Sequence, residues 1–205
     1  MSPSLRMGKE LHMEQEKSDK QKKPSLLVEI FDWVDSVVFS VILMILVFTL
    51  VFRIVGIKGE SMENTVLDGE KVIISDVFYT PKQGDIVVIS RDYFNSLGQP
   101  VEGSEPIIKR VIATEGQTVN IDFESGIVYV DDQPLDEPYT KTPTNRQDDV
   151  QFPLTVEDDC VFVLGDNRAI SKDSRDSSIG LVNERYILGK VILRVYPFDR
   201  FGSLD

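Results

Sequence analysis

The sequence predicts a mainly β protein in which a single N-terminal transmembrane helix precedes a β-rich domain. An uncharged apolar run of 17 residues occupies positions 36–52. Beyond it, short runs rich in Val and Ile alternate with Gly, Pro and Asp, a pattern typical of β-strands joined by turns. With 205 residues, the chain has room for one core of moderate size after the apolar run. We therefore expect one folded domain.

Residues 1–30 are predicted to form a disordered polar tail. Charges of both signs and few apolar side chains mark its first 25 residues, so this segment cannot bury enough apolar surface to fold. The tail also contains His12, the only histidine of the chain.

The apolar run is predicted to be an uncleaved membrane anchor over residues 31–55. A helix of 17 residues is about 26 Å long, slightly less than the ~30 Å core of a bilayer, so flanking apolar residues such as Trp33 and Ile54 are expected to extend it. A secretory signal peptide would lie closer to the start and end at a small-residue cleavage site. A buried core helix is disfavoured because the run is apolar on every face and stands apart from the rest of the chain.

The orientation of the anchor is predicted from the basic residues on its two sides. Those before the run are Lys17, Lys20, Lys22 and Lys23, and those after it are Arg53, Lys58 and Lys71. This slight excess favours a cytoplasmic tail and an extracytoplasmic domain by the positive-inside rule. We expect a single-pass protein of the cell membrane, in contact with the lipid bilayer.

Residues 56–205 are predicted to form the β-rich domain. Strands are expected at residues 71–74, 85–90, 106–114, 118–121, 127–130, 161–164 and 190–195. The Gly-containing turn before residue 127 makes the fourth and fifth of these a hairpin. Four prolines predict an irregular stretch over residues 132–158.

Charge and cysteine content exclude several classes of partner and site. There are 34 Asp and Glu against 22 Lys and Arg, a net charge of -12, which repels phosphate backbones and excludes nucleic acid as a partner. A single cysteine, Cys160, cannot form an intramolecular disulfide, and together with one histidine it cannot build a zinc site. Cys160 is expected to be a small buried residue at the start of a strand.

Ser61 is the candidate nucleophile, in the motif Gly-Glu-Ser-Met at residues 59–62. A serine hydroxyl needs a neighbouring base to accept its proton. His12 precedes the anchor and Ser61 follows it, so a bilayer would separate the two. The base must then be a lysine or a carboxylate. Taken alone, Ser61 is more simply an ordinary turn serine.

Lys109 is the strongest candidate for that base. Period two along a strand places it on one face with Ile107, Val111 and Ala113, an apolar neighbourhood. Burial there would lower the pKa of the amine from about 10.4 and favour its neutral form. Taken alone, an edge-strand lysine that reaches water is the simpler interpretation. Arg110 faces the other way and is better suited to pair with a carboxylate.

A third cluster follows the strand predicted at 161–164. Residues 165–175 read Gly-Asp-Asn-Arg-Ala-Ile-Ser-Lys-Asp-Ser-Arg, and Gly180 comes soon after. The hydroxyl, carboxylate and guanidinium groups can form a rigid hydrogen-bonded platform. A solvated polar loop is the open alternative.

These segments, in this order and after an anchor, resemble the bacterial type I signal peptidases, membrane-bound serine proteases with a Ser/Lys dyad. The resemblance covers nearly all of the chain from residue 36 onward. It rests on residues 59–62, 84–88, 108–112 and 165–168, with Ser171, Asp173, Ser174, Arg175 and Gly180. The ordered co-occurrence of these motifs is far more specific than any one of them.

The resemblance implies a role for each matching residue. Ser61 would be the nucleophile, Lys109 the general base, and Ser171 a hydrogen-bonding partner that orients the Lys109 amine. A platform would be held by the ion pairs Arg110–Asp166 and Asp173–Arg175. Shallow pockets for small residues at −1 and −3 of the scissile bond would be lined by Ile57, Met62, Val66, Ile107 and Ile108.

The resemblance also implies the reaction. The substrates would be secretory pre-proteins whose signal peptides end in Ala-x-Ala, cleaved through an acyl-enzyme by a monomer that requires no metal or cofactor. Phe198 and Phe201 are candidates for membrane contact, with ordinary packing equally open.

The chain departs from the family pattern at two positions. Asn64 stands where family members commonly have a proline, so the turn after Ser61 lacks a fixed φ. Gly59 stands where some members have a serine that donates to the oxyanion, so the oxyanion hole is expected to rest mainly on the Ser61 N–H.

Other functions fit less well. A penicillin-binding or β-lactamase-type enzyme requires Ser-x-x-Lys, but position 64 is Asn, and an α/β-hydrolase requires Gly-x-Ser-x-Gly, but position 63 is Glu. A membrane-tethered β-domain that binds partners without catalysis remains the alternative from another class. The set of Ser61, Lys109 and Ser171 argues against it.

Overall fold

The computed structural model describes residues 26–90 and 106–204. The chain divides into two compact units, Met1–Phe48 and Thr49–Asp205. The predictions for residues 1–25, which include His12, lie outside the described part of the chain.

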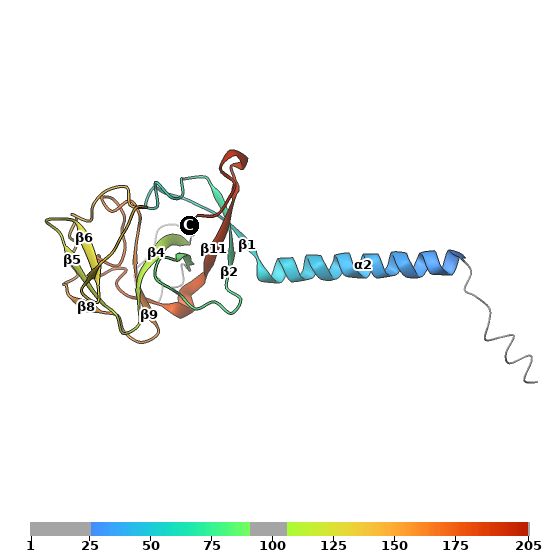
Figure 1. Cartoon of the computed structure of the whole chain (residues 1–205), viewed down its shortest axis with the longest axis horizontal. Helices are drawn as coiled ribbons and strands as arrows, with labels where there is room; N and C mark the ends of the chain where they lie inside the picture. The colour runs from blue at the N-terminus through green and yellow to red at the C-terminus, as the bar shows by residue number, and fades with distance from the viewer. Residues whose placement is uncertain (1–25, 91–105, 205) are drawn as a thin grey trace, which may run out of the picture. The chain divides into compact units, whose positions relative to one another are not determined.

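The apolar run forms helix α2 (Leu26–Val51), shown in Figure 1. Within it, Ile30–Val51 has a mean hydropathy of 2.6 and is not buried against the protein. These 22 residues are about 33 Å long, enough to cross a bilayer core. Each of two hydroxyls inside the helix donates to a carbonyl one turn earlier, Ser36 to Asp32 and Ser40 to Ser36.

Helix α2 differs from the predicted anchor at both ends. The helix begins at Leu26, so residues 26–30 do not belong to a disordered tail. It ends at Val51, before the predicted limit of residue 55, and β1 (Arg53–Gly56) follows. The reason is pairing, since the residues from Arg53 to Gly56 form an antiparallel ladder with Lys71–Ile74 that residues of a continuing helix could not make.

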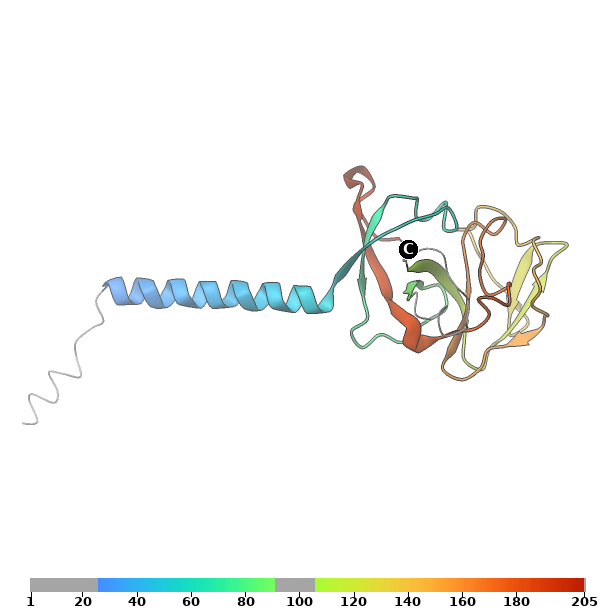
Figure 2. The same ribbon diagram turned by 180° about the vertical axis from the view of Figure 1, so that it is seen from behind.

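The larger sheet of the second unit has seven antiparallel strands (Figures 1 and 2). In spatial order they are β1 (Arg53–Gly56), β2 (Lys71–Ser75), β11 (Ile187–Tyr196), β3 (Ile86–Ile89), β4 (Ile107–Thr114), β9 (Cys160–Leu164) and β10 (Val182–Asn183). Strand β4 pairs with β9 only from Arg110 to Thr114, so residues 107–109 have no described strand on that side. This open edge carries Lys109.

The smaller sheet has four strands and contains the predicted hairpin. Its order is β7 (Gln133–Pro134), β6 (Ile127–Val130), β5 (Thr118–Asp122) and β8 (Leu154–Thr155). Strands β5 and β6 pair antiparallel, which confirms the hairpin. Two short 3-10 helices, η1 (Glu184–Tyr186) and η2 (Phe198–Arg200), complete the described elements.

The mainly β prediction is confirmed, and each of the seven predicted strands has a counterpart. The strands that the sequence did not reveal are β1, β7, β8 and β10, which have four residues or fewer and too little pattern to detect. Strands β7 and β8 fall within residues 132–158, so that stretch is less irregular than expected.

Hydrophobic clusters lie on both faces of the large sheet. Val88 and Ile108 belong to one cluster, whereas Val87 and Val111 belong to another, as the alternation of strand side chains requires. A register shift between Val111 and Ala113 places Ala113 in a third cluster, so this residue does not share a face with Val111 as expected.

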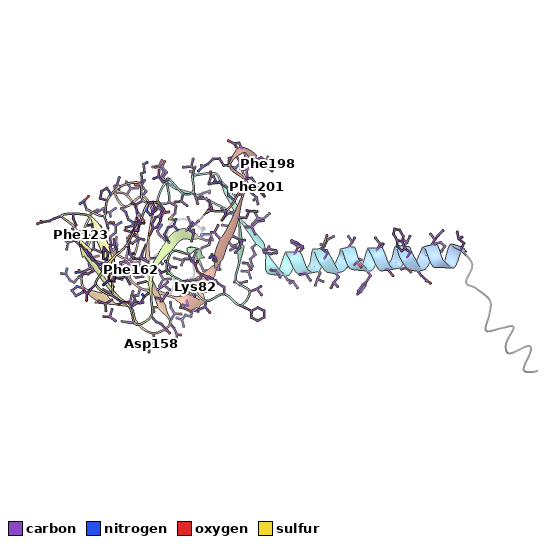
Figure 3. The ribbon with its side chains drawn as sticks, viewed as in Figure 1. Lys82, Phe123, Asp158, Phe162, Phe198 and Phe201 are labelled. Carbon is purple, nitrogen blue, oxygen red and sulfur yellow. The ribbon has the colours of Figure 1, made fainter. Side chains whose placement is uncertain are left out.

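The third cluster packs the small sheet against β4 and β9. In it, the ring of Phe152 makes edge contacts with Phe123 at 5.9 Å and Phe162 at 5.8 Å between centroids; the latter two are labelled in Figure 3. Cys160 is buried at the start of β9, as predicted.

Candidate active site

Ser61 lies in a tight turn between β1 and β2. The turn is closed by the N–H of Val66, which donates to the Met62 carbonyl, and is anchored by the buried side chains of both residues. At its start Gly59 has φ +88°, a left-handed conformation that favours glycine. The Gly59 N–H donates to Asp68 Oδ1 at 2.8 Å. Ser61 is therefore held on a backbone fixed at both ends.

Lys109 reaches this turn from β4. Its side chain is buried, and Nζ lies 2.8 Å from Ser61 Oγ and 3.0 Å from the Ile108 carbonyl oxygen. Desolvation lowers the pKa of Lys109 from 10.5 to about 8, against the nearby charges of Asp173 and Asp166, which raise it. The structure thus brings together the two residues that the sequence selected, at proton-transfer distance.

The predicted hydrogen bond from Ser171 to the Lys109 amine is not present. Ser171 Oγ is buried and has no hydrogen-bond partner among the described residues. The Lys109 amine instead contacts Ser61 Oγ and the Ile108 carbonyl oxygen. Ser171 nevertheless lies close to the backbone of Ser61. A Cβ placed on Gly165 would come within 2.2 Å of Ser171 Oγ and 2.5 Å of the Ser61 carbonyl oxygen, so only glycine allows this close packing.

Both predicted ion pairs are present and bidentate. Arg110 donates from Nε and Nη2 to Asp166 at 2.9 and 2.8 Å. Arg175 donates from the same atoms to Asp173 at 2.8 and 2.9 Å. All four side chains are buried, so each charge depends on its partner for compensation.

Asp166 and Asn167 connect this platform to the nucleophile turn. Thr65 donates its hydroxyl to Asp166 Oδ2 in a very short contact. The Asn167 N–H donates to the Ser61 carbonyl at 3.0 Å, and its side-chain amide donates to the Glu60 carbonyl at 3.2 Å. The loop that contains Asp166 and Asn167 therefore both neutralises Arg110 and holds the turn that carries Ser61 in place.

Sequence reasoning missed several members of the platform. Arg168 is fully buried and pairs with Glu137 at 2.6 Å, and Glu63 pairs with Lys141. Glu137 and Lys141 come from the stretch expected to be irregular. Nothing in their spacing pointed to these contacts, because they join segments far apart in the sequence.

The predicted pocket residues fall into two groups. Ile57, Met62, Val66 and Ile108 are buried in one cluster, whereas Ile107 is half-buried against another because adjacent strand residues face opposite sides. A groove of about 600 Å³ passes β1 and is lined by residues 54–58 and Pro106. Of the five predicted residues, only Ile57 lines this groove.

No group of three His, Cys, Asp or Glu side chains suited to a metal is found in residues 26–90 and 106–204.

Asn64 has φ +92°, so replacing it with proline is expected to distort the turn that carries Ser61. Proline locks φ near −65°, and a mismatch of this kind costs about 1–3 kcal/mol. We expect Asn64→Pro to lower kcat/KM about tenfold, and Asn64→Gly, which tolerates positive φ, to stay within about threefold of wild type. Cleavage assays on the two variants test this; a fully active Asn64→Pro would contradict it.

Comparison with known proteins adds independent information. The family model described as signal peptidase, peptidase S26, matches residues 30–196. Signal peptidase I P of Bacillus subtilis subsp. natto is 32% identical over 192 residues, which cover 89% of this chain and 95% of that protein. A probable signal peptidase I-1 of Synechocystis is 36% identical over 153 residues, covering 72% and 73%. A solved signal peptidase I from Enterococcus faecalis is 25% identical, with a TM-score of 0.41, covering 55% of this chain and 97% of that one.

Proposed function

The chain belongs to the signal peptidase family, peptidase S26, and we propose that Ser61 and Lys109 carry out its reaction. As a type I signal peptidase it is a serine endopeptidase that removes signal peptides. The observation that carries the proposal is the 2.8 Å distance between Lys109 Nζ and Ser61 Oγ. A buried amine with a lowered pKa next to a serine is the arrangement that this chemistry needs.

Two open strand edges offer backbone groups with which an extended substrate can pair. Strand β1 is at the edge of the large sheet, and residues 107–109 of β4 have no described partner strand on one side. An extended pre-protein segment that pairs with residues 54–59 and 107–108 adds a strand by β-augmentation. The groove beside Ile57 receives its side chains, and small residues at −1 and −3 place the scissile carbonyl at Ser61.

The reaction then proceeds in two stages. Neutral Lys109 accepts the Ser61 proton while Oγ bonds to the scissile carbonyl carbon, and the protonated amine gives that proton to the leaving nitrogen. Lys109 next removes a proton from water as the water oxygen bonds to the acyl carbon. The bond between that carbon and Ser61 Oγ then breaks, and the protonated amine returns the proton to Oγ. Among the described residues the Ser61 N–H donates to no protein acceptor, so it is free to stabilise the oxyanion.

The remaining groups position this dyad. The ion pairs Arg110–Asp166 and Asp173–Arg175 keep the platform rigid. All of these groups come from one chain, so a monomer suffices for the proposed reaction.

The apolar helix and the similarity to signal peptidase I proteins indicate membrane anchoring. In the orientation proposed here, residues 1–25 are cytoplasmic and the unit that begins at Thr49 is extracytoplasmic, where translocated pre-proteins emerge. Anchoring raises the effective concentration of the dyad at the membrane surface.

Mapping the cut in a pre-protein tests this function. The full chain in detergent is incubated with a pre-protein that contains an Ala-x-Ala site, and the products are identified by mass spectrometry. We expect cleavage after the second Ala by the wild type and a loss of about 10⁴-fold or more in Ser61→Ala. Equal cleavage by both proteins would show that Ser61 is not the nucleophile.

A further inference from the structure

A second cavity, of about 380 Å³, lies beside the nucleophile turn and is lined by three arginines. Arg110, Arg194 and Arg200 form part of its wall, together with Thr65 of the turn and Tyr139. The Arg110 guanidinium stacks on the Tyr139 ring at 3.8 Å from the centroid. The proposed reaction uses Arg110 only as the partner of Asp166, so the purpose of the cavity is open.

The charges around this cavity do not balance. Arg110 is paired with Asp166, whereas Arg194 and Arg200 share one buried carboxylate, Glu70. Within the described residues, three guanidinium groups therefore meet two carboxylates. Counted over residues 26–90 and 106–204 alone, one positive charge has no anionic partner in this partly enclosed space, where its interaction with an anion is stronger than in bulk water.

Arg194 and Arg200, which share Glu70, also have N–H groups that donate to no acceptor among the described residues. Arg194 uses Nε on the Arg200 carbonyl and Nη1 on the Thr65 carbonyl and Glu70, and Arg200 uses Nη1 on Glu70. In residues 26–90 and 106–204, no acceptor is recorded for Arg194 Nη2 or for Nε and Nη2 of Arg200. Guanidinium N–H groups of this kind are well suited to bind an oxyanion such as a phosphate.

The segment that carries Arg200 also presents aromatic side chains. Phe198 and Phe201 are 83% and 60% exposed, and Figure 3 shows them close together at one extremity of the domain. Exposed aromatic rings beside basic groups are typical of surfaces that lie at a lipid interface. The whole chain has a net charge of -12, so attraction to an anionic surface requires a local site.

We propose that this cavity binds the phosphodiester headgroup of an anionic phospholipid through Arg194 and Arg200. The bound headgroup supplies the missing negative charge, while Phe198 and Phe201 contact the lipid beside it. Arg194 already holds the Thr65 carbonyl at 3.0 Å, so headgroup binding stabilises the turn that carries Ser61. Anionic lipid then speeds cleavage; this last consequence rests on the proposed function of Ser61.

The binding test does not depend on catalysis. The full-length Ser61→Ala protein in neutral detergent is unfolded by heat with dihexanoyl phosphatidylglycerol or with dihexanoyl phosphatidylcholine. At a concentration about ten times Kd, phosphatidylglycerol should raise Tm by about 3–6 °C and phosphatidylcholine should not. Arg200→Gln should abolish the shift, because it removes the excess charge and leaves Arg194 paired with Glu70.

Arg185→Gln is the matched control, because Arg185 is an arginine of η1 whose guanidinium contacts Tyr186 outside the cavity. It should keep the full shift. Equal loss in both variants, or no shift in the parent protein, would overturn the proposed site. If inorganic phosphate alone gave the same Arg200-dependent shift, the cavity would be a free-phosphate site and the lipid assignment would be wrong. A failed dyad would appear only in cleavage assays and would leave these shifts unchanged.

Discussion

Replacing Lys109 with methionine is expected to abolish cleavage and, in the same variant, to make the protein harder to unfold. Methionine fills a similar volume without an amine, so Ser61 loses the base that lies 2.8 Å from its hydroxyl. The rate should fall by about 10⁴-fold or more, as when a member of a serine-protease triad is removed. Purified protein and a pre-protein substrate are sufficient for this measurement.

The gain in stability follows from the lowered pKa. Burial reduces the pKa of Lys109 from 10.5 to about 8, which means that a protonated Lys109 costs the folded state about 3 kcal/mol at pH 7. Methionine avoids this cost but loses two hydrogen bonds, so we expect a net gain of about 1–3 kcal/mol at pH 7.

The pH dependence has a definite sign. Between about pH 8 and 10.5 the unfolded chain retains a proton that the folded chain has released, so wild-type stability rises with pH. The advantage of Lys109→Met should therefore be full below pH 8 and shrink above it. Lys172→Met is the control, because the Lys172 side chain is 61% exposed. A less stable Lys109→Met at pH 7 would contradict the account.

The second large effect is expected for Arg110→Met, which leaves Asp166 buried without its bidentate partner. Breaking a buried pair in this way typically costs about 3–5 kcal/mol. The loss should appear in urea unfolding as a lower midpoint with an unchanged slope. Cleavage should fall as well, because Asp166 also holds Thr65 of the nucleophile turn.

Removing both charges separates the loss of the pair from the loss of packing. The double variant Arg110→Met with Asp166→Leu should recover part of the stability, because no uncompensated charge remains. Lys172→Met again provides the control, since Lys172 is 61% exposed in its ion pair with Asp176 and the pair should contribute less than about 1 kcal/mol. A loss below about 1 kcal/mol for Arg110→Met would show that Asp166 is not held as described.

The sequence was sufficient to predict the parts of the molecule that depend on local pattern. Alternating Val and Ile residues identified the longer strands, and an unbroken apolar run identified the helix. Ser61 and Lys109 were selected by chemistry, since a serine without a histidine on its side of the anchor needs another base. The two ion pairs were implied by family resemblance, and the structure contains both.

The remaining features depend on contacts between distant segments. The sequence predicts the residues of β1 as the end of the anchor, because these apolar residues become a strand only through pairing with β2. Glu137 and Lys141 contact Arg168 and Glu63 across the fold, and no local pattern marks such partners. The left-handed φ of Asn64 is likewise set by the turn as a whole.

The pH dependence of kcat/KM tests most directly whether neutral Lys109 activates Ser61. Pre-protein cleavage by the full chain is measured from pH 6 to 10, with Asn64→Gly as a variant that leaves both groups in place. Because the pKa of Lys109 is about 8, kcat/KM should fall about tenfold per pH unit below that value and level off above it. A profile that stays level from pH 6 to 9 would contradict a lysine base.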